Sequence, residues 1–506
     1  MSAAPARATS RRFLTRRIGT ADRERLHAVK HTARQPAGDR VRPSARGWWW
    51  NEAVEHDPGP PTSPLDGDET ADVVIVGGGY TGMWTAYALT EAQPGIRVTL
   101  LEREECGAGP SGRNGGFASG WWDELPALVS SYGDDAALAA CRAVGRSVRA
   151  IGDWCRQHGV DAWFNHKGYL QVATSPSQEG TWSDAVSVAR RLGVEEELVP
   201  LSAEDVKARC ASPVMGSGVL MRDGATVQPA RLARGLRRVL LERGVRIHEY
   251  TPVSRLRPGA SVTAVTARGT VRAEHAVLGV NAWATQWPGL RGLLVTWGSH
   301  IVLTAAAPER LADLGWDGEC ISDGRTALHY FRTTPDGRVA FGGGGGRASW
   351  LGRVGPQVDQ DPASIARAAR GLRRIFPSLA DVPVEHAWGG PIDVSPSHLP
   401  FFGTLRPGNV HYAVGYTGNG VAPSHLAGQV LAGLALGRKD EVTGLPMVGH
   451  RPRRFPPEPF RSIGGHLVRH AIIRRDAALD VGGRVNPVLE FVARLPRRLG
   501  YNLGPE

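Results

Sequence analysis

A glycine-rich turn between two apolar runs constrains the fold of this 506-residue chain more than any other feature. Residues 73–76 form a continuous β-branched run, typical of a strand buried on both faces of a parallel sheet. The sequence GGGYTG follows at 77–82 and opens a helical pattern, after which a second apolar run ends at Glu102. The glycines satisfy the G-x-G-x-x-G pattern of a dinucleotide-binding βαβ unit. This context predicts a Rossmann-like nucleotide domain.

The residues of this unit have separate predicted roles. Gly77 permits a tight turn, Gly79 lets the backbone approach a pyrophosphate, and Gly82 lets the helix pack closely on the strand. The helix N-terminus then faces the phosphate anion. An acid at the end of the second strand is placed to accept a hydrogen bond from a ribose hydroxyl. The residues predicted to bind the nucleotide here are Gly77, Gly79, Tyr80, Thr81, Gly82, Glu102 and Arg103.

Two further glycine-rich loops favour FAD over NAD. The segment GAGPSGRNGG at 107–116 can wrap a long cofactor with backbone donors, and its polar side chains can face a flavin ring. The segment GYTGNG at 415–420 lies between a buried strand and a helix, so it forms a second anion-facing helix start. The cofactor residues predicted in these loops are Ser111, Arg113, Asn114, Gly115, Gly415, Gly418, Asn419 and Gly420. An NAD-dependent dehydrogenase and a non-catalytic flavoprotein or interaction module remain the alternatives.

The combination of VVIVGGGYTG, TLLERE and GAGPSGRNGG resembles the D-amino-acid-oxidase-like FAD-dependent oxidoreductases, and within them the branch of the gamma-glutamylputrescine oxidases. The resemblance covers residues 71 to about 437. It implies non-covalent FAD, with Val253 beside the adenine. It also implies oxidation of a C–N bond in a small amine or amino acid: a hydride passes to flavin N5, water hydrolyses the imine, and oxygen or another acceptor reoxidises the flavin.

The candidate catalytic residues on the substrate side are His300, Tyr330 and Arg332. Tyr330 and Arg332 share one face of an expected strand because their spacing is two residues. An arginine there could hold a substrate carboxylate through its bidentate fork. An arginine on a solvent-facing strand face is the alternative.

The pattern of elements predicts an α/β fold in which a Rossmann-like FAD-binding domain is interrupted by an antiparallel-sheet substrate domain. The expected parts are a disordered basic extension at 1–47, FAD-binding segments at 48–165, 216–290 and 381–440, substrate segments at 166–215 and 291–380, and a basic extension at 441–506.

Charge and cysteine usage restrict the partners and the compartment. The net charge is +11, and the positive excess lies in residues 1–47 and 450–506, which favours solvated tails over contact with an anionic surface. Five scattered cysteines without a CxxC pattern indicate a reducing compartment and no metal site, with Cys320 free and not attached to flavin. No apolar run reaches the ~18 residues of a membrane span. We therefore expect a cytoplasmic enzyme with no transmembrane segment and no specific nucleic-acid partner.

Overall fold

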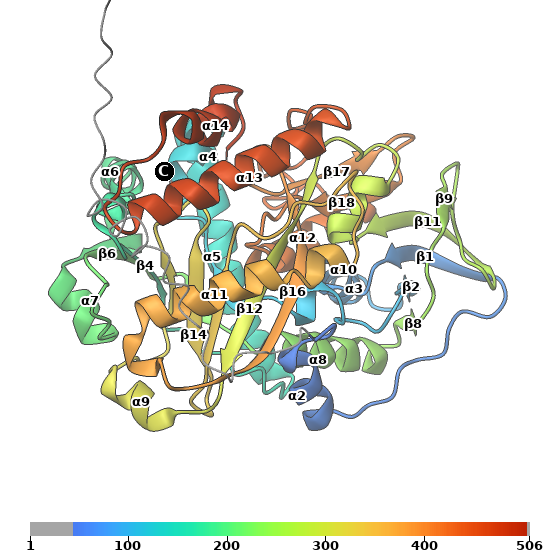
Figure 1. Ribbon diagram of the computed structural model, residues 1–506. Helices are drawn as coiled ribbons and strands as arrows, with labels where there is room; N and C mark the ends of the chain where they lie inside the picture. The colour runs from blue at the N-terminus through green and yellow to red at the C-terminus, as the bar shows by residue number, and fades with distance from the viewer. Residues whose placement is uncertain (1–43, 503–506) are drawn as a thin grey trace, which may run out of the picture. The chain divides into compact units, whose positions relative to one another are not determined.

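The computed structural model describes residues 44–502, which fall within one compact unit (Figure 1). In this part of the chain the helices are α2 (Trp48–His56), α3 (Tyr80–Ala92), α4 (Leu125–Tyr132), α5 (Asp134–Gln157), α6 (Ser183–Arg191), α7 (Ala203–Arg209), α8 (Pro229–Glu242), α9 (Pro308–Asp313), α10 (Pro356–Asp359), α11 (Pro362–Ile375), α12 (Val421–Ala435), α13 (Phe460–Leu479) and α14 (Pro487–Arg498).

One sheet, which we call the nucleotide sheet, contains the predicted βαβ unit. Its strands are β1 (Glu69–Val76), β2 (Val98–Leu101), β8 (Arg246–His248), β9 (Arg255–Arg257), β10 (Val262–Val265), β11 (Thr270–Leu278), β17 (Phe401–Leu405) and β18 (Val410–Val414). The order is β17-β18-β11-β1-β2-β8, and β10 and β9 extend from β11 as antiparallel strands. The central strands run parallel, so Val76 pairs with both Leu101 and Leu278. The carboxyl ends of β1, β2 and β11 therefore meet at one edge, where a ligand of such a sheet binds.

A second sheet, the substrate sheet, has the order β16-β12-β15-β14-β13-β4-β6-β5. Its strands are β4 (Tyr169–Val172), β5 (Leu198–Leu201), β6 (Gly218–Met221), β12 (Val295–Thr304), β13 (Cys320–Asp323), β14 (His329–Thr333), β15 (Val339–Gly343) and β16 (Val384–Val394). The pairs are antiparallel except β13 with β4. Phe331, Phe341 and Phe376 pack in the core beneath helix α11. A small third sheet joins β3 (Phe117–Ser119) to β7 (Gly224–Thr226).

The strands of the two large sheets alternate along the chain, because the nucleotide sheet takes strands from 69–101, 246–278 and 401–414. The mixed α/β fold class is thus confirmed. Two strands of the substrate sheet lie beyond the expected segment limits of 215 and 380. These are β6, whose partners are β4 and β5, and β16, which pairs along the whole of β12.

The segments at both ends of the described chain pack on this core. Ser44 N donates to Ala387 O at 2.8 Å, and α2 packs against α8, so the last residues of the expected 1–47 extension are ordered. Most of that extension lies outside the described residues. Helices α13 and α14 contact each other and occupy the upper part of the view in Figure 1. Between residues 44 and 502 no helix is long and apolar enough to cross a membrane.

Candidate active site

A cavity of about 1560 Å³ runs along the carboxyl edge of the nucleotide sheet and reaches the substrate sheet. All three glycine-rich loops line it. Its volume exceeds the ~300–1,000 Å³ of common ligand pockets, so it has room for a dinucleotide together with a small substrate.

The turn between β1 and α3 is built around glycines. Gly77 has φ +106°, and a Cβ there would collide with Gly279 O, while a Cβ on Gly82 would collide with Gly77 O. A Cβ on Gly79 would instead meet only the Ser111 hydroxyl, at 3.0 Å, and this residue lines the cavity. Two of the glycines are therefore required by the protein's own packing, and Gly79 leaves open the space into which a pyrophosphate would fit.

Glu102 lies at the end of β2 and lines the cavity. Its carboxylate accepts hydrogen bonds from Gly78 N at 2.7 Å and from Glu104 N at 2.9 Å. Burial raises the pKa of this carboxyl. A carboxylate has more acceptor positions than these two donors use, so Glu102 keeps capacity for ribose hydroxyls.

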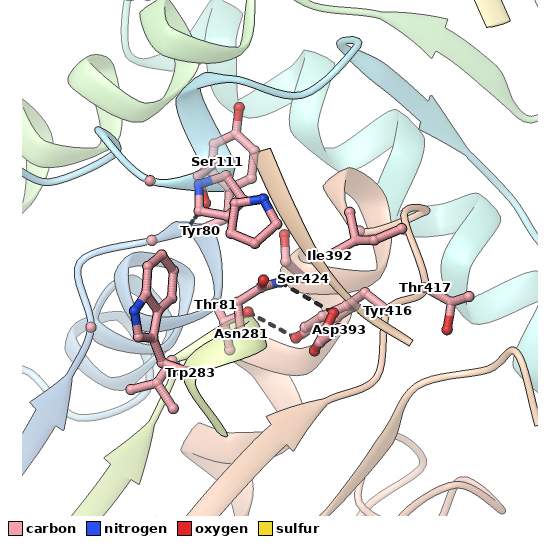
Figure 2. A pocket seen from close by; sticks show the side chains of 18 of the residues that line it. Tyr80, Thr81, Ser111, Asn281, Trp283, Ile392, Asp393, Tyr416, Thr417 and Ser424 are labelled. Carbon is pink, nitrogen blue, oxygen red and sulfur yellow. Dashed lines mark hydrogen bonds between the residues drawn. The ribbon is translucent and has the colours of Figure 1, made fainter. Parts of the chain in front are cut away.

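The loop at 107–116 is fastened at several points. The Ser111 hydroxyl accepts a hydrogen bond from Tyr80 N at 2.9 Å (Figure 2), and Asn114 Oδ1 accepts from Gly116 N at 2.7 Å. Arg113 lines the cavity, and its guanidinium donates to Ala45 O at 3.0 Å and forms an ion pair with Asp359 at 3.4 Å. Gly115 also lines the cavity, where a Cβ would lie 2.8 Å from the ring of Tyr330. The loop thus separates the nucleotide part of the cavity from the substrate sheet.

A buried acid that the sequence did not single out holds the third loop. Asp393, at the end of β16, accepts hydrogen bonds from Gly415 N at 2.5 Å and from Asn281 Nδ2 at 3.2 Å (Figure 2). Burial raises the pKa of Asp393 to about 7, and the backbone donors oppose this shift. Gly415 and Gly418 adopt left-handed φ values of +85° and +93°, which glycine allows.

Of the predicted members of this loop, Gly418, Asn419 and Gly420 line the cavity, and Gly415 does not. Asn419 accepts a hydrogen bond from the Ser119 hydroxyl at 3.2 Å, and Gly420 precedes the first turn of α12. Across the cavity the hydroxyl of Thr81 lies 2.8 Å from that of Tyr416 (Figure 2). The N-termini of α3 and α12 are thereby joined at the same cavity, which gives two helix ends able to stabilise negative charge.

The far end of the nucleotide part is lined by Val253 together with Thr251 and Pro252. Arg103 lies there with its guanidinium 4.8 Å from the ring centre of Trp283, and both residues line the cavity. The predicted adenine contact at Val253 is therefore in a position that an adenine can reach.

The substrate sheet contributes a chamber of hydroxyl and amide groups at the opposite end. Tyr330 faces this chamber, and its hydroxyl lies 2.8 Å from that of Ser299. Burial raises the pKa of Tyr330 to about 12, so the phenol stays protonated. On neighbouring strands the hydroxyl of Tyr169 lies 2.6 Å from that of Ser322, and Gln171 follows on β4.

Neither His300 nor Arg332 lines the cavity. His300 is fully buried, accepts a hydrogen bond from Asp361 N at 3.2 Å, and has its pKa lowered to about 4 by burial. The guanidinium of Arg332 donates to the carbonyls of Gly116 and Val227 and lies 5.4 Å from the Trp49 ring centre. Burial lowers the pKa of Arg332 to about 10. Arg332 therefore holds the end of the loop at 107–116 in place by hydrogen bonds. Because it does not line the cavity, its guanidinium is not placed to bind a substrate carboxylate.

Acidic residues stand in the chamber where an arginine was expected. Asp123 and Glu124 follow β3 and line the cavity. Glu124 accepts from His398 Nδ1 at 2.9 Å, whereas no basic side chain hydrogen-bonds Asp123 within residues 44–502. Burial and the neighbouring charge of Glu124 raise the pKa of Asp123 to about 7. The six arginines that line the cavity are Arg103, Arg113, Arg255, Arg406, Arg451 and Arg454, and none of them belongs to the substrate sheet.

Comparison with known proteins identifies the family. The family described as FAD dependent oxidoreductase matches residues 72–434, which include both large sheets and all three glycine loops. The chain belongs to this family. Gamma-glutamylputrescine oxidoreductase of Escherichia coli (strain K12) is 30% identical over 404 residues, which is 78% of this chain and 90% of that protein. Glycine oxidase of Pseudomonas aeruginosa is 28% identical, over 74% and 97% of the two chains.

Solved structures agree on the fold. Glycine oxidase from Geobacillus kaustophilus superposes with a TM-score of 0.61 at 20% identity, covering 74% of this chain and 96% of that one. The protein is accordingly an FAD-dependent oxidoreductase of the D-amino-acid-oxidase-like family, and its cofactor is FAD. The open space at Gly79, the spare acceptors of Glu102 and the two helix N-termini fit that cofactor. The sulfur of Cys320 is fully buried, 3.5 Å from Gly168 O, and its residue does not line the cavity, which fits a cofactor held without a covalent bond.

Proposed function

We propose that this enzyme oxidises the C–N bond of a small cationic amine whose reacting carbon bears no carboxylate. Bound FAD supplies the hydride acceptor, and the protein supplies orientation and electrostatics. Loss of hydride from the neutral amine leaves an iminium ion, which water hydrolyses to a carbonyl compound and a free amine. The charge of the substrate chamber is the observation that carries the proposal.

The chamber offers carboxylate acceptors for a positively charged group, and no arginine of the substrate sheet is placed there to bind a carboxylate. Asp123 faces the cavity with no hydrogen bond to a basic side chain among the described residues, and beside it lies Glu124, to which His398 is bonded. An arginine in the chamber would have favoured an amino-acid substrate, but the Arg332 guanidinium donates its hydrogen bonds to the carbonyls of Gly116 and Val227. An ammonium group entering this chamber gains a charge-assisted hydrogen bond, whereas a carboxylate would meet two acids.

Asp123 has a second use in this scheme, because only a neutral amine can release hydride. A carboxyl whose pKa is raised to about 7 accepts a proton from a bound ammonium more readily than an ordinary aspartate does. The hydroxyl pairs Tyr169–Ser322 and Tyr330–Ser299 orient the amine by hydrogen bonds. The name of one relative with 30% identity, gamma-glutamylputrescine oxidoreductase, contains putrescine, a diamine, in keeping with an amine substrate.

Anaerobic flavin bleaching tests the proposal. A panel should compare aliphatic diamines and their mono-acylated derivatives with glycine, sarcosine and D-alanine, each titrated into the oxidised holoenzyme. We expect the compounds without an α-carboxylate to reduce the flavin at the lower concentrations. An α-amino acid that reduces the flavin at the lowest concentration would overturn the substrate class, and a flavin that nothing in the panel bleaches would overturn the reaction.

A pair of variants locates the selectivity. Asp123→Asn should raise the half-saturating amine concentration at least about tenfold, since a hydrogen bond to a charged group contributes ~1.5–3 kcal/mol. Flavin content should not change. Glu195→Gln, which alters an exposed acid away from the cavity, is the matched control. Equal kinetics for Asp123→Asn and wild type would remove Asp123 from substrate binding.

A further inference from the structure

Helices α13 and α14 follow the part of the chain that matches the family, since that match ends at residue 434. Their inner side is firmly attached to the substrate-sheet region. Asp480 forms an ion pair with Arg325, Asp476 accepts from Ala327 N at 2.9 Å, and Arg469 donates to Gly345 O at 3.0 Å. The two helices also share a small apolar core. They therefore hold a fixed orientation and present a fixed outer face.

Exposed apolar side chains lie on α13. Phe460, Ile463 and Leu467 lie on one face of α13 and are 69%, 45% and 60% exposed. The Trp350 ring lies 5.7 Å from that of His466, which extends the surface beyond the helix. We call the exposed large apolar side chains of these two helices and the segments beside them the C-terminal patch: Trp350, Leu351, Phe460, Ile463, Leu467, Val481, Val488, Phe491 and Leu499. These nine are among the eleven large apolar side chains exposed in the described part of the chain, so exposure is concentrated here and not scattered.

The charges on the same helices are separated by sign. The three acids between 460 and 502 are all engaged: Asp476 and Asp480 bind the core, and Glu490 pairs with Arg475 at 2.9 Å and with Arg494. Arg474 and Arg484 are exposed and have no acidic partner among residues 44–502. His470 and Arg498 are exposed as well. Arg474 lies seven residues after Leu467, so this face of α13 combines aromatic and aliphatic side chains with a positive charge that has no acidic partner among residues 44–502.

This combination favours one occupant. Two copies of the chain meeting through the C-terminal patch would bring like charges together, which disfavours a dimer. An anionic bilayer accepts both features, because basic side chains reach its headgroups while aromatic and aliphatic side chains enter the boundary with the acyl chains. A peripheral contact of this kind needs no membrane-spanning helix.

We propose that the C-terminal patch binds the enzyme to the surface of an anionic lipid bilayer. The inference is independent of the substrate and of the reaction proposed above. It also gives the basic C-terminal segment a partner in place of the solvated tail that charge alone favours.

Co-sedimentation of the full-length holoenzyme with lipid vesicles tests the proposal. Vesicles of mixed phosphatidylglycerol and phosphatidylcholine should bind the protein, vesicles of phosphatidylcholine alone should bind it weakly, and added salt should weaken the anionic case. Arg474→Glu and Leu467→Glu should each lower the partition coefficient at least about tenfold. Both side chains are exposed, and flavin content and melting temperature report whether either variant is misfolded.

The matched controls are Arg257→Glu on β9 and Leu241→Glu on α8, which change exposed residues of the same types on elements other than α13 and α14. All variants keep the basic residues of 1–43. Binding that survives both patch variants, or that the controls weaken equally, would overturn the proposal. A concentration-dependent dimer in ultracentrifugation that Leu467→Glu abolishes, without vesicle binding, would assign the patch to a second copy instead.

Discussion

Gly79→Val should separate cofactor binding from folding. Gly79 has φ −80° and ψ −179°, an extended conformation open to any residue. A Cβ there meets only the Ser111 hydroxyl, at 3.0 Å, so the protein alone tolerates the change with a small adjustment of that side chain. The valine methyl groups then occupy the space of the pyrophosphate. Overpacking of this kind costs ~1–3 kcal/mol, which raises the FAD dissociation constant about 5- to 150-fold.

The assay is reconstitution of the FAD-free protein, with the dissociation constant taken from flavin fluorescence quenching. The melting temperature of the FAD-free variant should stay near that of the wild type. Gly259→Val, at a surface glycine whose Cβ would lie 3.4 Å from Ser261 O, should change neither quantity. A wild-type dissociation constant for Gly79→Val would refute the assignment of the turn. If the FAD-free variant lost as much stability as the FAD-bound variant, the substitution would be damaging the fold and not the pyrophosphate site.

Three further changes test the roles of single groups. Arg332→Ala empties a buried site and leaves Val227 O without its side-chain donor, whereas Gly116 O keeps the hydrogen bond from Val227 N. The free energy of unfolding should therefore fall by ~2–4 kcal/mol in denaturant titration. An effect on KM alone would place the guanidinium in the chamber. Because the pKa of Asp123 is raised to about 7, its carboxylate forms as pH rises through 7. The half-saturating amine concentration of the wild type should therefore fall between pH 6 and 8. The fall should be steeper than that of Asp123→Asn, which has no carboxyl to titrate at this position. The pKa of Asp393 is about 7 in the folded protein, compared with ~3.9 for an unfolded aspartate. Between these two pH values only the folded state binds the proton. The FAD-free protein should therefore lose stability as pH rises from about 4 to 7. Asp393→Asn should flatten this slope, and identical melting profiles would contradict the assignment.

The nucleotide half of the site could be predicted from sequence because its signals are local. The glycines of 77–82 and the acid at 102 lie within one βαβ unit, so their positions follow from the geometry of a single turn. The same holds for the loop at 415–420 between β18 and α12. The structure brings both segments to the cavity, and the contacts of their single residues with FAD stay a prediction.

The substrate half depends on distant segments. Tyr330 and Arg332 do share a strand face, but the strand passes from the chamber to the space beneath the loop at 107–116, and spacing cannot show where the cavity ends. Asp123 faces the chamber because β3 pairs with β7, more than a hundred residues later in the chain. The bounds of helix α13 could not be predicted, because the Gly464-Gly465 pair weakens its helical pattern.

The placement of β18 also constrains when the protein can acquire its flavin during synthesis. β11 pairs with β18 across an interval that contains most of the substrate sheet. At ~5–20 residues per second the ribosome needs on the order of ten seconds to cross that interval. Throughout that time residues 276–278 of β11 lack their partner strand, and the loop at 415–420 is missing. Flavin loading is therefore a late event, and the growing chain must keep its half-built sheet from pairing with neighbours until β18 emerges.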